Sequence, residues 1–319
     1  MDKKELYRKF CQQESIPIFL NDWWLDVVAE GYKWDVLIHK SGDKVVGVFP
    51  YVLKKRMGLK LITMPKLTPY LGPWIKYPGG QKYSSRLAYE KDVYTDLIEM
   101  LPKFDYYKQR FHHTFTNWAS FYWKGFRQTT RYTYILEDLD NRDWLWENLQ
   151  PKIRTDIKKA KDRFKLEIRD DISYDELISL NENTFKRQGQ PLPYSRTFLE
   201  NVFSSCTKHK SGKAFYAVDP SKKVHAAVYV VWDDLTVYYL MGGSDSELRN
   251  SGASSYLVWH AIQFAASESK AFDFEGSMIE PVERFFRAFG GRLVPYFTIF
   301  KINSKLLRLF NAFKGNLEV

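Results

Sequence analysis

The stretch KAFDFEGSMIEPVERFFRAFGG, residues 270–291, decides the fold of the second half of the chain. It alternates Phe272, Asp273, Phe274 and Glu275 and then breaks at Gly276. Alternate side chains of a strand lie on one face, so the two phenylalanines face a packed layer and the two carboxylates lie together on the other face. The alternation therefore predicts a strand whose open end presents two neighbouring carboxylates.

The residues before this stretch predict a βαβ unit. LTVYYLMGG, residues 235–243, has the composition of a strand, residues 251–255 are small, and a helical pattern runs from Tyr256 to Ala266. A strand, a small-residue loop, a helix and a return strand make one such unit. We expect Asp273 and Glu275 to face a cleft beside the small-residue loop.

A similar order of elements occurs twice along the chain. Strand-like runs occupy residues 33–40, 45–53 and 59–64, and again residues 213–218, 224–232 and 235–243, each set with polar turns between the runs. A helical stretch precedes each set, up to about residue 30 and over about 173–205. The repetition predicts two domains of one α/β fold, residues 1–138 and 139–319, joined where a strand ends in an acidic turn.

Composition limits the class of protein. Six His without metal-ligand spacing predict no metal site, and two Cys predict no disulfide framework. A charged N-terminus and short apolar runs favour a cytoplasmic protein. The net charge of +10 favours a polyanionic partner. No zinc-finger or helix-turn-helix pattern occurs, so we do not expect a DNA-binding protein.

The small-residue loop is the first candidate site. Its backbone N–H groups at the start of a helix suit an anion, whereas simple N-capping of that helix by Ser251 or Ser254 is the alternative. The six candidate anion-binding residues are Arg249, Asn250, Ser251, Gly252, Ala253 and Ser254.

These residues resemble the Arg/Gln-x-x-Gly-x-Gly/Ala loop of the GNAT acyltransferases, with Ser254 at the last position. LQPKIRTDIKKAKDRFKLEIRD, FDFEGSMIEPVERFFRAFGG and PKLTPYLGPW are also similar to stretches of the Fem family, tandem-GNAT ligases that move an amino acid from aminoacyl-tRNA to a peptidoglycan precursor. The resemblance implies two GNAT-like domains, each a mixed, mostly antiparallel sheet flanked by helices, with the acyl-donor site in the second.

The resemblance also implies splayed strands that admit the donor, which is aminoacyl-tRNA or acyl-CoA, and no tightly bound cofactor. The acceptor is then an amine of a cell-envelope precursor. An acyl-CoA-dependent N-acyltransferase acting on an amino sugar or small amine is the runner-up. Phe286 stands where many GNAT acetyltransferases have a proton-donating Tyr, which leaves open a third class, an inactive module that binds RNA or an anionic glycan.

Asp273 and Glu275 are the candidate catalytic residues. Acyl transfer needs a base that takes a proton from the attacking amine, and two adjacent carboxylates raise the pKa of one of them. The alternative is structural: one of the two caps the following segment or pairs with Arg284.

Basic residues supply the candidate phosphate contacts, either to tRNA or to a lipid-linked pyrophosphate. The residues singled out are Arg154, Lys158, Arg284 and Arg287, and the alternative for each is a solvated surface charge. Arg287 stands where the Fem family commonly has a Lys.

The C-terminal stretch predicts an amphipathic helix. Leu306, Leu309, Phe310 and Phe313 share a face, with Lys305, Arg308 and Lys314 nearby. We expect this face to dock on the core; peripheral contact with the inner face of the cell membrane is the alternative.

Overall fold

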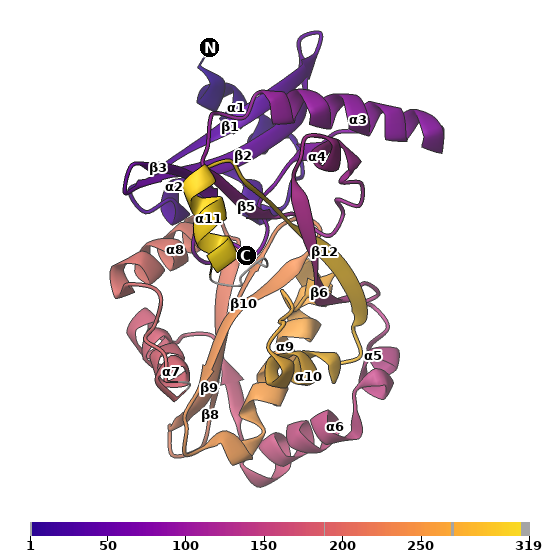
Figure 1. Cartoon of the computed structure of the whole chain (residues 1–319). Coiled ribbons are helices and arrows are strands. Elements are labelled where there is room, and N and C mark those ends of the chain that lie inside the picture. Colours follow the sequence, from indigo (N-terminus) through magenta and orange to yellow (C-terminus); the bar gives the residue numbers. More distant parts are fainter. Residues whose placement is uncertain (1, 188, 269–270, 314–319) are drawn as a thin grey trace. The chain divides into compact units, whose positions relative to one another are not determined.

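The structure is a computed structural model that describes residues 2–187, 189–268 and 271–313 (Figure 1). The helical elements are α1 (Lys3–Gln13), η1 (Ile18–Leu20), α2 (Asp22–Val28), α3 (Tyr83–Glu99), α4 (Ala119–Trp123), α5 (Arg142–Asn148), α6 (Pro151–Lys158), η2 (Lys159–Arg163), α7 (Tyr174–Arg187), α8 (Arg196–Lys208), η3 (Arg249–Ser251), α9 (Ala253–Glu268), α10 (Glu280–Arg287) and α11 (Lys305–Phe313). The strands are β1 (Lys33–Ser41), β2 (Lys44–Arg56), β3 (Leu59–Thr63), β4 (Trp74–Ile75), β5 (Tyr106–Arg110), β6 (Arg127–Leu136), β7 (Glu167–Arg169), β8 (Gly212–Val218), β9 (Val224–Trp232), β10 (Val237–Ser244), β11 (Phe272–Asp273) and β12 (Arg292–Ile302).

The chain divides into two compact units. The first consists of Met1–Arg131 with Pro295–Val319, and the second of Tyr132–Val294. This grouping by contacts assigns the residues from 295 onward to the first unit, whereas the sequence places them in the second domain. The boundary between residues 138 and 139 stays a prediction about domains that fold independently.

In the first unit, β1, β2 and β3 form an antiparallel set, and β5 lies parallel to β3 after the crossover helix α3. β12 is antiparallel to β5, and the short β4 pairs with β2. Val93, Tyr94 and Leu97 of α3 are buried in the same core cluster as Phe49 of β2 and Tyr107 of β5. The apolar face of α3 therefore covers one face of this sheet.

The second unit repeats this order of strands. β8, β9 and β10 are antiparallel, and β11 lies parallel to β10 after the crossover helix α9. β6 is antiparallel to β11, and β7 pairs with β8 at the other edge. Both units thus have a mixed, mostly antiparallel sheet flanked by helices, which confirms the predicted fold class and the βαβ unit.

Helices cover both faces of the second sheet. Val228 and Val230 of β9 share a buried cluster with Leu257 and Ile262 of α9, so α9 lies on that face. Tyr229, between them, points to the other face and packs on Phe203 of α8 with ring centroids 4.4 Å apart. The alternation of side chains along one strand thus supplies both layers.

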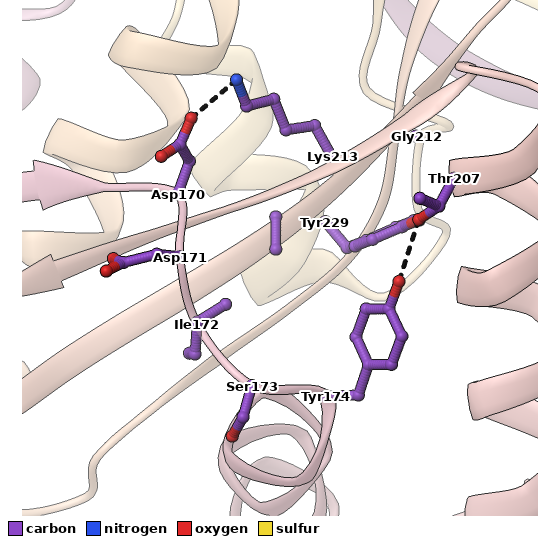
Figure 2. Close-up of a pocket in the computed structure, with 10 residues that line it drawn as sticks. Asp170, Asp171, Ile172, Ser173, Tyr174, Thr207, Gly212, Lys213 and Tyr229 are labelled. Atoms are coloured by element: carbon purple, nitrogen blue, oxygen red, sulfur yellow. Dashed lines mark hydrogen bonds and ion pairs between the residues drawn. The ribbon is translucent and has the colours of Figure 1, made fainter.

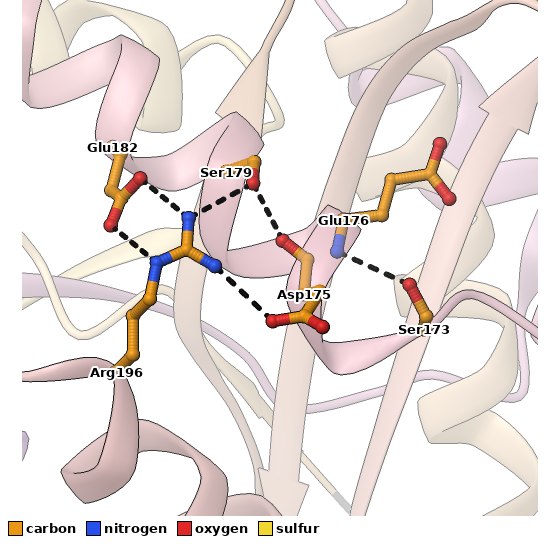
Figure 3. A network of polar contacts seen from close by, with 6 residues as sticks. All are labelled: Ser173, Asp175, Glu176, Ser179, Glu182 and Arg196. Carbon is orange, nitrogen blue, oxygen red and sulfur yellow. Dashed lines mark hydrogen bonds and ion pairs between the residues drawn. The ribbon is translucent and has the colours of Figure 1, made fainter.

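The predicted helical region 173–205 consists of two helices, α7 and α8. Arg196, the first residue of α8, joins them: its guanidinium donates to Glu182 at 2.8 and 3.1 Å, to Ser179 at 3.1 Å and to Asp175 at 3.2 Å (Figure 3). The Ser195 side chain accepts from the Phe198 N–H and caps α8. A helix start inside the predicted helical region therefore divides it into a hairpin of two helices.

The prediction that α11 docks on the core is wrong for the two leucines whose side chains are described. Leu306 is 79% and Leu309 is 60% exposed. The side chains of Phe310 and Phe313 and the whole of Lys314 lie outside the described residues. Within the described part of the chain, no helix is long and apolar enough to cross a membrane.

Candidate functional site

The second unit has an opening between two parallel strands. Among the residues that the structure describes, β10 pairs with β11 through Val237 with Phe272 and Tyr238 with Asp273, although β10 continues to Ser244. A bulge in the β9–β10 ladder between Tyr239 and Met241 begins at the same level. Bulges bend a strand and increase its twist. β10 and β11 therefore separate after two residues, as the family resemblance implies.

The Asp273 side chain lies where β11 ends. It is fully buried, and its Oδ1 accepts from the Thr133 hydroxyl and, at 2.7 Å, from the Glu275 N–H. Such a carboxylate bond to the N–H two residues on forms an Asx turn, which ends a strand. In this geometry Asp273 positions the turn. Its role as a base stays a prediction.

The turn after Asp273 bends the chain toward β6. Glu275 and Gly276 have φ values of +56° and +59°, in the left-handed region. A Cβ on Gly276 would lie 2.1 Å from the Tyr132 carbonyl oxygen. The Phe274 N–H donates to the Tyr134 carbonyl at 3.1 Å. The backbone thus leaves β10 and follows β6, and half-buried Glu275 stands at the tip of the turn.

The predicted anion loop precedes α9, and α6 and η2 pack against it. Gly252 has φ +81°, and a Cβ there would lie 2.2 Å from the Asp156 carbonyl oxygen. Lys159 of η2 donates to the Asn250 side chain at 3.0 Å. The close packing of α6 against the loop therefore requires glycine at position 252, whether or not a phosphate also approaches there. The Ser251 hydroxyl accepts from the Ala253 N–H at 3.3 Å, while Ser254 is exposed.

A second arginine lies near this loop. The pKa of the Arg187 guanidinium at the end of α7 is lowered by burial and by the nearby charge of Arg249. An anion bound near both guanidinium groups would relieve this repulsion. Arg187 was missed by sequence reasoning because no local pattern links the end of α7 to a loop 60 residues later.

Tyr239 is the second residue that sequence reasoning missed. Its ring packs on Phe286 with centroids 5.3 Å apart, and a Cβ on Gly242 would meet its hydroxyl at 2.0 Å. Burial, followed by the charge of Glu275, raises its pKa, so the hydroxyl stays protonated. The structure thus places Tyr239 of β10 against Phe286 of α10, the position at which the family resemblance leads one to expect a tyrosine.

Two of the predicted phosphate contacts come from α6. The Arg154 Nη1 donates to the carbonyl oxygens of Glu147 at 2.9 Å and Trp146 at 3.4 Å, near the end of α5. Lys158, one turn later, is exposed. Arg154 therefore gives the Glu147 carbonyl a charged donor and adds a second donor to the Trp146 carbonyl, which also accepts from the Leu149 N–H at 3.3 Å.

Replacing Arg154 tests this role. We expect Arg154→Ala to lower the free energy of unfolding by about 1–2 kcal/mol, because two carbonyl oxygens lose a charged donor. Lys158→Ala, on the same helix, should change it by less than about 0.5 kcal/mol. Urea denaturation followed by tryptophan fluorescence measures both, and equal small changes would contradict the capping role.

The other two predicted contacts lie on α10. Arg284 is exposed, and the Arg287 Nε pairs with Glu283 at 3.0 Å. The Glu283 carboxylate also accepts from the Tyr134 hydroxyl, and the pKa of Tyr134 is raised to about 12 by burial and by that bond. The phosphate-binding roles of both arginines stay predictions.

A pocket of about 450 Å³ lies away from the opening (Figure 2). Its Asp170 pairs with Lys213 at 2.7 Å, and the Tyr174 hydroxyl bonds that of Thr207 at 2.9 Å. Tyr229 lines it from the α8 face of the sheet, opposite the face covered by α9. The lining is Asp170, Asp171, Ile172, Ser173, Tyr174, Thr207, Gly212, Lys213, Ala214 and Tyr229, which includes none of the residues predicted from the sequence.

Known proteins agree with this architecture. The family model described as an acetyltransferase (GNAT) domain matches residues 148–280. A search of curated proteins finds no match. Among solved structures, FemX superposes with a TM-score of 0.67 at 13% identity, covering 97% of this chain and 98% of FemX.

Two further structures have a TM-score of 0.53. L-PGS from Bacillus licheniformis is 10% identical, with 97% of this chain and 94% of that one covered. A conserved protein of unknown function from Bacteroides thetaiotaomicron is 12% identical, with 88% and 90% covered. Residues 148–280 therefore match the GNAT domain family, and the chain as a whole shares the fold of FemX.

Proposed function

We propose that the protein is an acyltransferase that moves an aminoacyl or acyl group to an amine of a cell-envelope precursor of the peptidoglycan type. The observation on which this rests is the separation of β10 from β11 after two residue pairs, beside the start of α9. An extended acyl donor fits between separated strands as a further chain beside β10. Two β10 backbone groups beyond Tyr239 are bonded to α7: the Gly242 carbonyl accepts from the Asn181 side chain, and the Ser244 N–H donates to the Thr184 hydroxyl.

The chemistry assigns three roles. The neutral amine attacks the acyl carbonyl carbon, and Glu275 is the candidate base that takes the amine proton, with buried Asp273 holding the turn. The bond from the carbonyl carbon to sulfur or oxygen then breaks. Tyr239 donates its proton to that leaving atom, and the proton taken from the amine restores the hydroxyl. The protonated state of Tyr239 at neutral pH supports this role.

The donor phosphates are proposed to bind at the start of α9, between Arg187 and Arg249. Charge-assisted bonds to phosphate are roughly twice as strong as neutral ones. Both candidate donors offer such groups, CoA in its pyrophosphate and aminoacyl-tRNA in its backbone. The protein fold by itself supports either donor.

A binding experiment tests this site. We expect Arg187→Ala and Arg249→Ala each to weaken donor binding about 10-fold or more, the loss of one charged hydrogen bond. Arg142→Ala, an exposed arginine at the start of α5, should leave binding unchanged. Calorimetric titration with CoA and anisotropy with labelled tRNA measure the three variants, and equal affinities would contradict the assignment.

The same titrations separate the donors. Absence of heat at millimolar CoA would exclude the runner-up, an acyl-CoA-dependent N-acyltransferase of an amino sugar or small amine. Transfer of a labelled amino acid from charged tRNA to an amine-bearing peptidoglycan precursor would establish the leading proposal. Binding of RNA or an anionic glycan without any transfer, unchanged in Glu275→Gln and Tyr239→Phe, would favour an inactive binding module instead.

A further inference from the structure

The sheet of the first unit carries half-buried cations on the face that points away from α3. Tyr107 of β5 and Ile299 of β12 belong to the core cluster that includes α3. Because side chains alternate along a strand, the neighbours of Tyr107 and Ile299 lie on the opposite face. Lys108 and Arg110 of β5 are therefore on this opposite face, and both are half-buried.

A third cation, Arg131 of β6, reaches the same face. Its Nε donates to the hydroxyl of Tyr296 on β12 at 3.2 Å. Tyr296 is two residues before Thr298, which lies directly opposite Arg110 in the β12–β5 ladder, so their side chains share one face. The pKa of Lys108 is lowered by burial and by the charges of Arg110 and Arg131. Lys108 is therefore close enough to both arginines to be repelled by them.

These cations lack a negative partner within the described residues, where none of the three forms an ion pair with a carboxylate. The hydroxyl of Thr298, a residue 2% exposed, has no hydrogen-bond partner in the same part of the chain. A buried hydroxyl without a partner and cations that repel one another both cost free energy, which a bound anion would recover. We call Lys108, Arg110, Arg131 and Thr298 the β5–β12 cluster.

We propose that the β5–β12 cluster binds a phosphoryl group of a small molecule. Arginine presents a planar fork of N–H donors that matches phosphate oxygens, and charge-assisted bonds of this kind are roughly twice as strong as neutral ones. Three cations that converge on one place suit a compact group with two or more negative charges, whereas the backbone of a nucleic acid spreads single charges along its length. The Thr298 hydroxyl would donate to one further phosphoryl oxygen. This inference goes beyond the proposed function, whose donor site lies on the second unit.

Calorimetric titration of the full chain tests the proposal, with sodium pyrophosphate and sodium phosphate as the two probes. The background for the titration is Arg249→Ala, in which the proposed donor site of the second unit is weakened, so that the heat reports the first unit. We expect saturable binding of at least one probe to a single site. Tighter binding of pyrophosphate would indicate a diphosphate ligand, and equal or tighter binding of phosphate a monophosphate; both results support the proposal.

Matched variants in the same background identify the cluster. Lys108→Ala and Arg131→Ala should each weaken binding about 10-fold or more, because each removes a charge-assisted bond to the anion. Arg127→Ala is the control, since exposed Arg127 lies four residues before Arg131 on β6, about 13 Å along the strand, and this variant should bind like the background protein. Thr298→Val should weaken binding about 3-fold and raise the melting temperature of the ligand-free protein, because the buried hydroxyl becomes a methyl group.

Three results would overturn the proposal. One is the absence of heat at millimolar concentrations of both probes. Another is equal affinity of Lys108→Ala, Arg131→Ala and Arg127→Ala, each shown to be folded by circular dichroism. The third is tighter binding of a short single-stranded RNA that the first two of these variants abolish, which would assign the cluster to nucleic acid. Failure of the proposed transfer reaction would leave these readouts unchanged, because no acyl donor or acceptor takes part in the titration.

Discussion

Gly276→Ala is expected to lower the free energy of unfolding by about 3–5 kcal/mol, the largest stability effect of any single change that we predict. Two costs add. An alanine at φ +59° is in the left-handed region, and its Cβ would stand 2.1 Å from the Tyr132 carbonyl oxygen and 2.6 Å from the Thr133 Cα. Both neighbours are backbone atoms of β6, so relief requires that β6 or the turn after β11 move.

Gly42→Ala is the control for this prediction. Gly42 has nearly the same φ, +60°, but nothing lies within 4 Å of its Cβ position. The Gly42→Ala variant should therefore be destabilised only by the conformational cost, about 1–2 kcal/mol. Urea denaturation of the two variants separates that cost from the clash, and equal losses would show that the turn can move away from β6 without penalty.

The local pattern of the sequence predicted three consecutive strands of each sheet and β11, but not β4, β5 or β12. The run 224–232 coincides with β9, and the run 33–40 ends one residue before β1 does. Alternating side chains and polar turns are encoded within a few consecutive residues, so they can be recognised without knowing which distant residues meet in the fold. The βαβ unit was predicted for the same reason.

Contacts between distant residues could not be predicted in this way. Thr133 and Asp273, 140 residues apart, bond to each other, and β12 lies beside β5 of the first half of the chain. The alternation at Phe272–Glu275 correctly placed the phenylalanines in the core, but only the structure shows that the Asp273 carboxylate holds a turn. Arg154 likewise resembled a surface cation until its carbonyl partners in α5 were known.

Tyr239 escaped prediction for another reason. A bulge shifts the ladder between Tyr239 and Met241, so simple alternation along β10 fails at this position. The signal that is present in the sequence is the pair Gly242 and Gly243 after a run of tyrosine and aliphatic residues. Glycine inside a strand indicates close approach by another group, which here is the Tyr239 hydroxyl at Gly242.

Tyr239→Phe is expected to lower kcat about 100-fold or more while KM changes by less than about 2-fold, in the transfer reaction that the donor experiment establishes. The variant removes one hydroxyl and keeps the ring, which packs on Phe286. Because the pKa of Tyr239 is raised, the wild-type hydroxyl stays protonated from pH 7 to about 9. We therefore expect no fall of kcat in this range from ionisation of Tyr239. If the Tyr239 hydroxyl instead had to lose its proton to act as a proton acceptor, kcat would rise with pH over this range.

Tyr216→Phe is the control, because it removes the hydroxyl of a strand tyrosine that lies away from the proposed site. The Tyr216 hydroxyl donates to Asp171 at 2.7 Å on β8, at a distance of two strands from β10, so its removal should leave kcat unchanged. If Tyr239→Phe also kept full kcat, the leaving atom would have to obtain its proton from another donor, since Phe286 has none. The Tyr134 hydroxyl, held by Glu283, would then be the next candidate, and Tyr134→Phe the variant that decides it.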